Sequence, residues 1–312
     1  MAASDPVLRP DPGERGLASW AADDLAELLL PAWDALLELA ETVDLDGPSR
    51  LPQRTARDRC IELGSWPGSR SIAVIVDEAR QATTEGSDFA TFDQKGHDAA
   101  LRDAWSAAPR REVLAALRRG REETAQFLAS DEPATLGRRM VRSPMGPLPL
   151  TTVVCGRMYD LAVHALDLVP AGAAEPPTAL LSGGLAAMTD TTGALAARLE
   201  ITGQASAVTP EGGWTFSGLD GSWRTLELPA VPDRWPRLEA EATDLLDASA
   251  GRQNPAALLA RRRIRVHRPA GLVAFAPLVE VPGLPGGPAI AAAVRNAQAV
   301  TGLLRRIPGV PG

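Results

Sequence analysis

The feature with the most chemical content is a carboxylate and an imidazole spaced by one helical turn. Asp160 and His164 are four residues apart in a segment with helical apolar spacing. A helix makes about 3.6 residues per turn, so both side chains lie on one face. They can bind one metal ion together, or form a buried hydrogen-bonded pair. The chain has three histidines, His97, His164 and His267, so histidine chemistry has few possible locations.

A second segment offers a third ligand. It reads Arg54-Thr-Ala-Arg-Asp-Arg-Cys-Ile-Glu-Leu-Gly-Ser-Trp66 and places Glu62 in a predicted helix. Carboxylate oxygens and imidazole nitrogens are ordinary ligands of divalent metals. Glu62, Asp160 and His164 are therefore the candidate metal ligands, provided that the fold brings the two segments together.

Cysteine content and hydropathy indicate a cytoplasmic protein. Cys60 and Cys155 are too few for a disulfide framework, and we expect both to be small core residues and not nucleophiles. The N-terminus lacks the pattern of a secretory signal. No apolar run approaches the roughly 20 residues that span a bilayer. We therefore expect no membrane partner.

The charge argues against nucleic acid as a partner. The net charge is −7, whereas contacts to phosphates need a basic surface. Arginines cluster over residues 110–121 and 261–265, and glutamates interleave with the first cluster. We interpret both clusters as solvated faces. The chain has no P-loop, nucleophile elbow, dinucleotide fingerprint or paired-cysteine motif.

The first half of the chain is predicted to be a helix bundle. Apolar spacing favours four helices, the second of them interrupted at residues 64–68: residues 18–43, 56–83, 109–128 and 150–168. Thr55 is the predicted cap of the second helix. Residues 1–16 are expected to be an unstructured lead, and His97 is expected in a surface loop.

The second half is predicted to mix helices and strands. Pro170–Pro177 is the best boundary in the chain. Beyond it the pattern predicts helices over 178–197, 240–250 and 290–304, and strands over 199–208, 214–217, 223–228 and 263–267. The expected fold is α+β with two domains: a four-helix bundle over residues 17–170, and an α+β domain with a mainly antiparallel sheet over residues 178–306.

Several short motifs occur in an order that resembles the mycothiol-dependent maleylpyruvate isomerase family. The family's W-T-V-R-D-x-x-x-H-L stands here as Arg54-Thr-Ala-Arg-Asp-Arg-Cys-Ile-Glu-Leu63. Its P-x-G-x-x-P and E-x-x-x-H-x-x-D-L stand as Pro144-Met-Gly-Pro-Leu-Pro149 and Asp160-Leu-Ala-Val-His-Ala-Leu-Asp-Leu168. Its A-T-D-L-L-x-x-x-x-G-R stands as Ala242-Thr-Asp-Leu-Leu-Asp-Ala-Ser-Ala-Gly-Arg252. The resemblance covers roughly residues 20–275.

The resemblance implies a fold and a chemistry. The bundle would be DinB-like, and the second domain would be similar to sterol carrier proteins. The implied activity is that of a metalloenzyme in which a metal-bound thiolate adds to a small electrophilic substrate, as in isomerisation or thiol transfer. Its cosubstrate would be mycothiol, a low-molecular-weight thiol. The implied metal is zinc, held by positions that correspond here to Glu62, Asp160 and His164.

Two departures from the family pattern alter the predicted metal site. Glu62 stands where the family has histidine, and Asp160 stands where it has glutamate. A divalent ion with one histidine and two carboxylates has a formal charge of zero, whereas the family's set leaves +1, so a bound thiolate would be less stabilised here. Oxygen-rich ligands also favour manganese or iron over zinc.

Two further positions match the family motifs. Arg252 is the implied catalytic arginine, which could reach a substrate carboxylate or could simply interact with the end of a helix. Asp167 could orient His164 or cap a helix. The competing hypothesis is a non-catalytic protein, with a metal-free bundle and a carrier-like domain that binds an apolar ligand or a partner.

Overall fold

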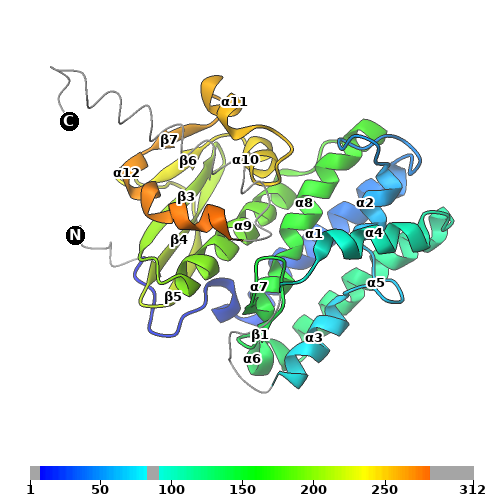
Figure 1. Cartoon of the computed structure of the whole chain (residues 1–312), viewed down its shortest axis with the longest axis horizontal. Coiled ribbons are helices and arrows are strands. Elements are labelled where there is room, and N and C mark those ends of the chain that lie inside the picture. The colour runs from blue at the N-terminus through cyan, green and yellow to red at the C-terminus, as the bar shows by residue number, and fades with distance from the viewer. Residues whose placement is uncertain (1–7, 83–90, 282–312) are drawn as a thin grey trace.

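A helical bundle and a five-stranded sheet lie side by side, with one long helix between them (Figure 1). The structure is a computed structural model, and it describes residues 8–82 and 91–281. The long helix, α9 (Thr178–Arg198), contacts bundle helix α8 (Arg157–Leu168) on one side and the sheet on the other. The expected α+β fold, with a helical first half and a mainly antiparallel sheet in the second, is confirmed.

Four helices form the core of the bundle, and each of them packs against two of the others. They are α1 (Ala22–Thr42), α2 (Ala56–Leu63), α5 (Arg110–Ala129) and α8. α1 carries leucines at helical spacing, and Leu25, Leu29 and Leu36 are fully buried. The predicted apolar spacing thus forms the predicted interface.

Local sequence sets the start of α2 and the approach of α5 to α1. Thr55 accepts a hydrogen bond from the backbone N–H of Asp58, whose carboxylate accepts one from the N–H of Thr55, which makes a capping box. On α5, a Cβ at Gly120 would lie 2.8 Å from the indole of Trp33. Glycine at this position therefore lets α5 pack directly on the buried tryptophan of α1.

Shorter elements complete the first half. They are η1 (Gly16–Ser19), α3 (Ile72–Gln81), α4 (Gln94–Trp105), α6 (Glu132–Leu136), α7 (Leu150–Cys155), and the strands β1 (Met140–Val141) and β2 (Leu148–Pro149). The predicted helix over 150–168 is two helices, α7 and α8, joined at Gly156. α4 was not predicted, and His97 lies on it and not in a loop.

The sheet has the order β5-β4-β3-β6-β7. Its strands are β3 (Gly203–Thr209), β4 (Gly212–Leu219), β5 (Ser222–Leu228), β6 (Arg237–Glu239) and β7 (Arg265–His267). All pairs are antiparallel except β3 with β6. Asp220 and Gly221 both have positive φ, as a tight two-residue hairpin turn requires, so the hairpin predicted there is confirmed.

The second half closes on the bundle through α9 and short helices. A Cβ at Gly184 of α9 would lie 2.6 Å from the Cβ of Ala162, so glycine permits the close contact between α9 and α8. After 3₁₀ helix η2 (Val169–Ala171), the remaining helices are α10 (Ala242–Ser249), α11 (Pro255–Ala260), α12 (Pro269–Leu272) and η3 (Val273–Glu280). The helix predicted over 290–304 lies outside the described residues.

Part of the N-terminal lead is structured, contrary to the expectation for residues 1–16. Leu8 is fully buried, and Glu14 pairs with Arg224 of β5. The carboxylate of Asp190 on α9 accepts hydrogen bonds from the backbone N–H of Leu17 and from Trp223 Nε1. The lead is ordered because it has partners far away in the sequence, which its own composition does not reveal.

Within residues 8–82 and 91–281, no helix combines the length and the apolar character that are needed to span a bilayer.

Candidate functional site

His164 is held by a buried carboxylate on its own helix. It lies on α8, and its side chain is 14% exposed. Its Nδ1 lies 3.2 Å from Oδ2 of Asp167, one turn further along the helix, and the Asp167 side chain is fully buried. Since Asp167 accepts at Nδ1, the neutral imidazole carries its proton there and leaves the Nε2 lone pair free.

Arg252 holds Asp167 from the second half of the chain. Its Nε lies 3.1 Å from Oδ1 and its Nη2 lies 2.8 Å from Oδ2, which is a two-point contact. Arg252 follows the C-terminal end of α10, and α10 packs on α8. The contact therefore joins the segment over residues 242–252, which ends in Arg252, to α8, the helix that bears His164.

The ionisation of Asp167 follows from these partners. Burial alone would raise its pKa, but the hydrogen bonds from His164 and Arg252, together with their charges, lower the pKa to about 2. Asp167 is therefore a carboxylate at neutral pH. Of the two roles left open for it by the sequence, the structure supports the orientation of His164.

Glu62 points into the protein, where two arginines hold it. Its side chain is 5% exposed. Arg59, one turn earlier on α2, donates from Nη1 to Oε2 at 2.7 Å and from Nη2 to Oε1 at 2.8 Å. Arg102 of α4 also pairs with Oε1. Both guanidinium groups are largely buried, so the carboxylate is charge-compensated from two sides.

The three predicted ligands are only partly brought together. His164 Nε2 faces Oε2 of Glu62 at 3.8 Å. Asp160 has a half-exposed side chain, 44% accessible, and it pairs with Arg157 at 3.4 Å. Within the part of the chain that the structure describes, no three histidine, cysteine or acidic side chains form a group that could hold a metal ion.

The chemistry of this donor set does not fit a divalent cation. Both oxygens of Glu62 already accept hydrogen bonds from guanidinium groups, whose positive charges repel a cation. Two positive charges therefore lie beside the oxygens that would bind the ion. Of the predicted set, His164 is the residue whose ligand atom is not paired with an arginine among the described residues.

A fourth carboxylate belongs to this site. Asp98 lies on α4, one turn before Arg102, and accepts a hydrogen bond from Gln94 Nε2 at 2.6 Å. Burial, and then the negative charge of Glu62, raise its pKa to about 6, and the charges of His164 and Asp160 also act on it. α4 thus brings both an acid and a guanidinium to the predicted site.

A second layer of polar contacts lies behind Asp167. The backbone N–H of Arg50 donates to the Asp167 carbonyl oxygen, and its guanidinium pairs with buried Asp247 of α10. Tyr159 Oη lies 3.1 Å from Ser249 Oγ. These contacts tie α10, which directly precedes Arg252, to the bundle and help to fix the position of that arginine.

The other sequence candidates lie elsewhere or are inert. Burial raises the pKa of the Cys60 thiol to about 12, and the pKa of Cys155 is also raised by burial, so both are core residues as expected. His97 Nε2 accepts from the backbone N–H of Arg70. His267, on β7, lies 3.0 Å from Glu239. A reactive thiol would have to come from outside the protein.

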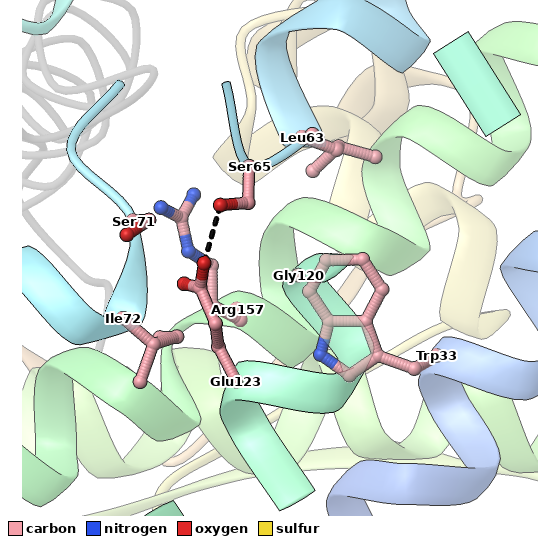
Figure 2. Close-up of a pocket in the computed structure, with 9 residues that line it drawn as sticks. Trp33, Leu63, Ser65, Ser71, Ile72, Gly120, Glu123 and Arg157 are labelled. Carbon is pink, nitrogen blue, oxygen red and sulfur yellow. Dashed lines mark hydrogen bonds between the residues drawn. The ribbon is translucent and has the colours of Figure 1, made fainter. Parts of the chain in front are cut away.

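A small cavity is lined by Trp33, Gly120 and Arg157, among other residues (Figure 2). Figure 2 shows Ser65 hydrogen-bonded to Glu123 among its lining residues, beside the indole of Trp33. Trp33 Nε1 is buried and has no partner among the described residues. The volume is about 10 Å³, which suits a single water molecule and not a substrate.

Sequence reasoning missed Arg59, Arg102 and Asp98. Arg59 stands three residues before Glu62, a spacing that permits an ion pair on one helix, and this was the available signal. Arg102 and Asp98 were missed together with α4 itself, whose mostly polar sequence has a single buried apolar residue, Leu101.

Comparison with known proteins finds a similarity in the part of the chain that carries Glu62, Asp167 and His164. Residues 26–169 match the family model of the mycothiol maleylpyruvate isomerase N-terminal domain. A crystal structure of the mycothiol-dependent maleylpyruvate isomerase is 14% identical, over 77% of this chain and 93% of that one, with a TM-score of 0.46. A histidine-to-alanine mutant of that isomerase is 12% identical, over 76% and 92%, also with a TM-score of 0.46. At this identity and TM-score the two structures carry no argument, and the match of the family model is limited to residues 26–169. No curated protein matches the chain.

Proposed function

Because residues 26–169 match the family model of the mycothiol maleylpyruvate isomerase N-terminal domain, we propose that this chain is an enzyme of the mycothiol-dependent isomerase type. It uses a low-molecular-weight thiol, mycothiol, to act on a small electrophilic molecule. The observation that carries the proposal is the chain of contacts from Arg252 through Asp167 to His164. These contacts orient one basic nitrogen where the two halves of the protein meet.

His164 is the proposed general base. Asp167 fixes the proton on Nδ1, so Nε2 can accept the proton of a thiol. The imidazolium that results would lie between two carboxylates, Asp167 and Glu62, and would be stabilised by both. A free thiol has a pKa of about 8.5, so a base held in this way increases the thiolate fraction at neutral pH.

The thiolate then adds to a carbon–carbon double bond conjugated with a carbonyl. A carbon–sulfur bond forms, and the π electrons move to the carbonyl oxygen. Rotation about the new single bond and loss of the thiolate restore the double bond with the other geometry, and His164 returns the proton to the sulfur. No electrons are gained or lost overall. Transfer of the thiol is the outcome when the adduct is not reversed.

Arg252 is proposed to act as a positioning residue. Two of its donor groups are used on Asp167, and Nη1 lies 3.5 Å from the Ala250 carbonyl oxygen. It therefore influences the reaction by fixing the carboxylate that orients His164. Contact of Arg252 with a substrate carboxylate, which the family motif implies, would use the N–H groups of Nη1 and Nη2 that these bonds leave available.

The metal-dependent form of this proposal differs only in how the thiol is ionised. Zinc, manganese or iron held by Glu62, Asp160 and His164 would lower the pKa of a thiol as a Lewis acid. The ion pairs of Glu62 with Arg59 and Arg102 favour the metal-free form, in which His164 removes the proton.

The test is thiol-dependent turnover by the full-length protein. Maleylpyruvate is the first substrate to try, followed by other cis-configured conjugated ketones and acids, each with and without mycothiol. We expect turnover only with mycothiol, and a loss of roughly 10²–10⁴-fold in kcat for His164→Asn. A change in KM without a change in kcat would contradict a role of His164 in proton transfer.

The alternative is a non-catalytic protein with a metal-free bundle and a carrier-like second domain. The occupied carboxylate of Glu62 is compatible with it. Binding of a fluorescent fatty acid, combined with no mycothiol-dependent turnover on any substrate of the panel, would favour the carrier function over the enzyme.

A further inference from the structure

Both oxygens of the Glu62 carboxylate accept hydrogen bonds from cationic side chains. Arg59 makes a two-point contact with it at 2.7 Å and 2.8 Å, and Arg102 adds a third bond from another helix. The three side chains are 5%, 6% and 13% exposed for Glu62, Arg59 and Arg102. A contact so little exposed to water is weakly screened, so it is a fixed part of the interior.

We infer that the guanidinium groups of Arg59 and Arg102 replace the divalent cation in this chain, so that the site binds no resident metal. The family pattern places a first metal ligand at the position of Glu62. Here that position binds two unit positive charges instead, which equals the charge of one divalent ion. The inference deepens the proposed function, on which it rests for the role of the site.

A divalent cation and the guanidinium groups of Arg59 and Arg102 cannot occupy this site together, because their positive charges repel one another. An ion bound to Oε2 of Glu62 and Nε2 of His164 would share the carboxylate with Arg59, and its charge would be repelled by both guanidinium groups. In a largely buried site this repulsion is weakly screened. Metal binding would require Arg59 and Arg102 to leave Glu62, which would bury two unpaired cations.

The remaining predicted ligand does not offset this cost. Asp160 is half-exposed and pairs with Arg157, so it too has a cationic partner. Each carboxylate of the predicted metal site thus has its own arginine. His164 is the one member without a cationic partner, and a single imidazole does not hold zinc.

The departures from the family motif are then linked. Histidine at position 62 could not bind two arginines, since a neutral imidazole has one acceptor nitrogen. Glutamate has two oxygens that accept from both. Glutamate at position 62, where the family has histidine, therefore fits the presence of Arg59 and Arg102. The three residues act as one unit.

The experiment measures metal binding by the full-length protein without a histidine tag. The protein is equilibrated with zinc chloride, separated from free ion by gel filtration, and analysed by mass spectrometry for zinc per chain. We expect far less than one zinc per chain in the wild type. Stoichiometric zinc that His164→Ala removes would overturn the inference.

Variants test whether the arginines are the cause. Glu62→His combined with Arg102→Met supplies a nitrogen ligand and removes one cation, so it should bind more zinc than the wild type and more than Glu62→His alone. Equal zinc in the double and single variants would contradict the role of Arg102. The matched control is Arg121→Met, which breaks the surface pair with Asp34 and should leave zinc content unchanged.

The result is separable from that of the proposed function. A wild type that binds no zinc and also shows no mycothiol-dependent turnover would refute the proposed function but support the metal-free site. A wild type with bound zinc and mycothiol-dependent turnover would support the enzyme and refute the metal-free site.

Discussion

Arg252 fixes the carboxylate of Asp167 by two hydrogen bonds, from Nε to Oδ1 at 3.1 Å and from Nη2 to Oδ2 at 2.8 Å. The two residues are 85 positions apart in the sequence. Through Asp167 the contact reaches Nδ1 of His164. The orientation of the imidazole therefore depends on the docking of α10 against the bundle, and the two halves of the chain complete one site.

Removal of the Asp167 charge should affect both activity and stability. In Asp167→Asn the orienting acceptor is weakened, and we expect kcat to fall roughly 10- to 100-fold, as for other partners of functional histidines. The wild-type pKa of Asp167 is lowered to about 2. Its contribution to stability is therefore present above the unfolded-state pKa, near 4, and is lost as pH falls through 2.

The measurement is urea unfolding of the wild type and Asp167→Asn at several pH values. Near pH 7 the wild type should be more stable by about 2 kcal/mol, and the difference should shrink toward pH 2. A difference independent of pH would show that the Asp167 charge does not stabilise the fold.

Substitution of Arg252 tests its positioning role. Lysine keeps the charge of Arg252 but cannot make the two-point contact with Asp167. Arg252→Lys should lower kcat roughly tenfold, with little change in KM. The matched control is Arg263→Lys, since Arg263 makes a similar two-point contact with Asp244. An increase in KM without a change in kcat would instead indicate that Arg252 binds substrate.

Asp98 should give the opposite pH dependence of stability. Burial, followed by the charge of Glu62, raises its pKa from 3.8 to about 6. Its favourable protonated form is fully present below the unfolded-state pKa, and this stability is lost as pH rises through 6. Relative to the wild type, Asp98→Asn should therefore gain about 1–2 kcal/mol between pH 4 and pH 8, after allowance for solvent screening.

Unfolding curves at the two pH values measure this gain. The control is Asp103→Asn, an exposed position on the same helix, which should show no pH-dependent difference from the wild type. The same pH dependence of stability in Asp98→Asn and Asp103→Asn would mean that the pKa of Asp98 is not raised.

Asp190 is expected to be a major determinant of stability. It is fully buried on α9, and Oδ1 accepts hydrogen bonds from Leu17 N, Trp223 Nε1 and Thr225 Oγ1. Asp190→Ala leaves these donors without a partner and should destabilise the fold by about 2–4 kcal/mol. Thermal or urea unfolding measures this loss. Asp233→Ala removes an exposed carboxylate that pairs with the buried Arg237, and it should change stability by less than about 1 kcal/mol.

The helices and strands with strong local signals were predictable from the sequence. The leucine spacing of α1, the Thr55 cap of α2 and the Asp220–Gly221 turn each arise from neighbouring residues, and each has the predicted structure. The two segments that carry Glu62 and His164 were also predicted to meet, and Oε2 and Nε2 of these residues are 3.8 Å apart.

Features set by distant partners were not predictable in this way. α4 is helical with one buried apolar residue, and β6 is three residues long and pairs in parallel with β3. The arginines around Glu62 could not be inferred, because their partner depends on where α4 packs. Pairing of charges over long sequence distances is a property of the fold and not of a motif.

The division into domains of residues 17–170 and 178–306 remains a proposal, as does the sterol-carrier-like character of the second. One apolar core includes residues of both parts, among them Leu161 of α8, Leu185 of α9 and Leu246 of α10. The proposed domains are therefore expected to unfold together.

The most direct measurement of the central claim is thiolate formation on the protein. Mycothiol is added to the full-length protein in the presence of EDTA, and the ultraviolet absorbance of the thiolate is recorded for the wild type and for His164→Asn. We expect thiolate absorbance near neutral pH in the wild type and its loss in His164→Asn, because His164 Nε2 takes the proton without a metal ion. Thiolate that forms only after zinc is added, or that forms equally in His164→Asn, would contradict it.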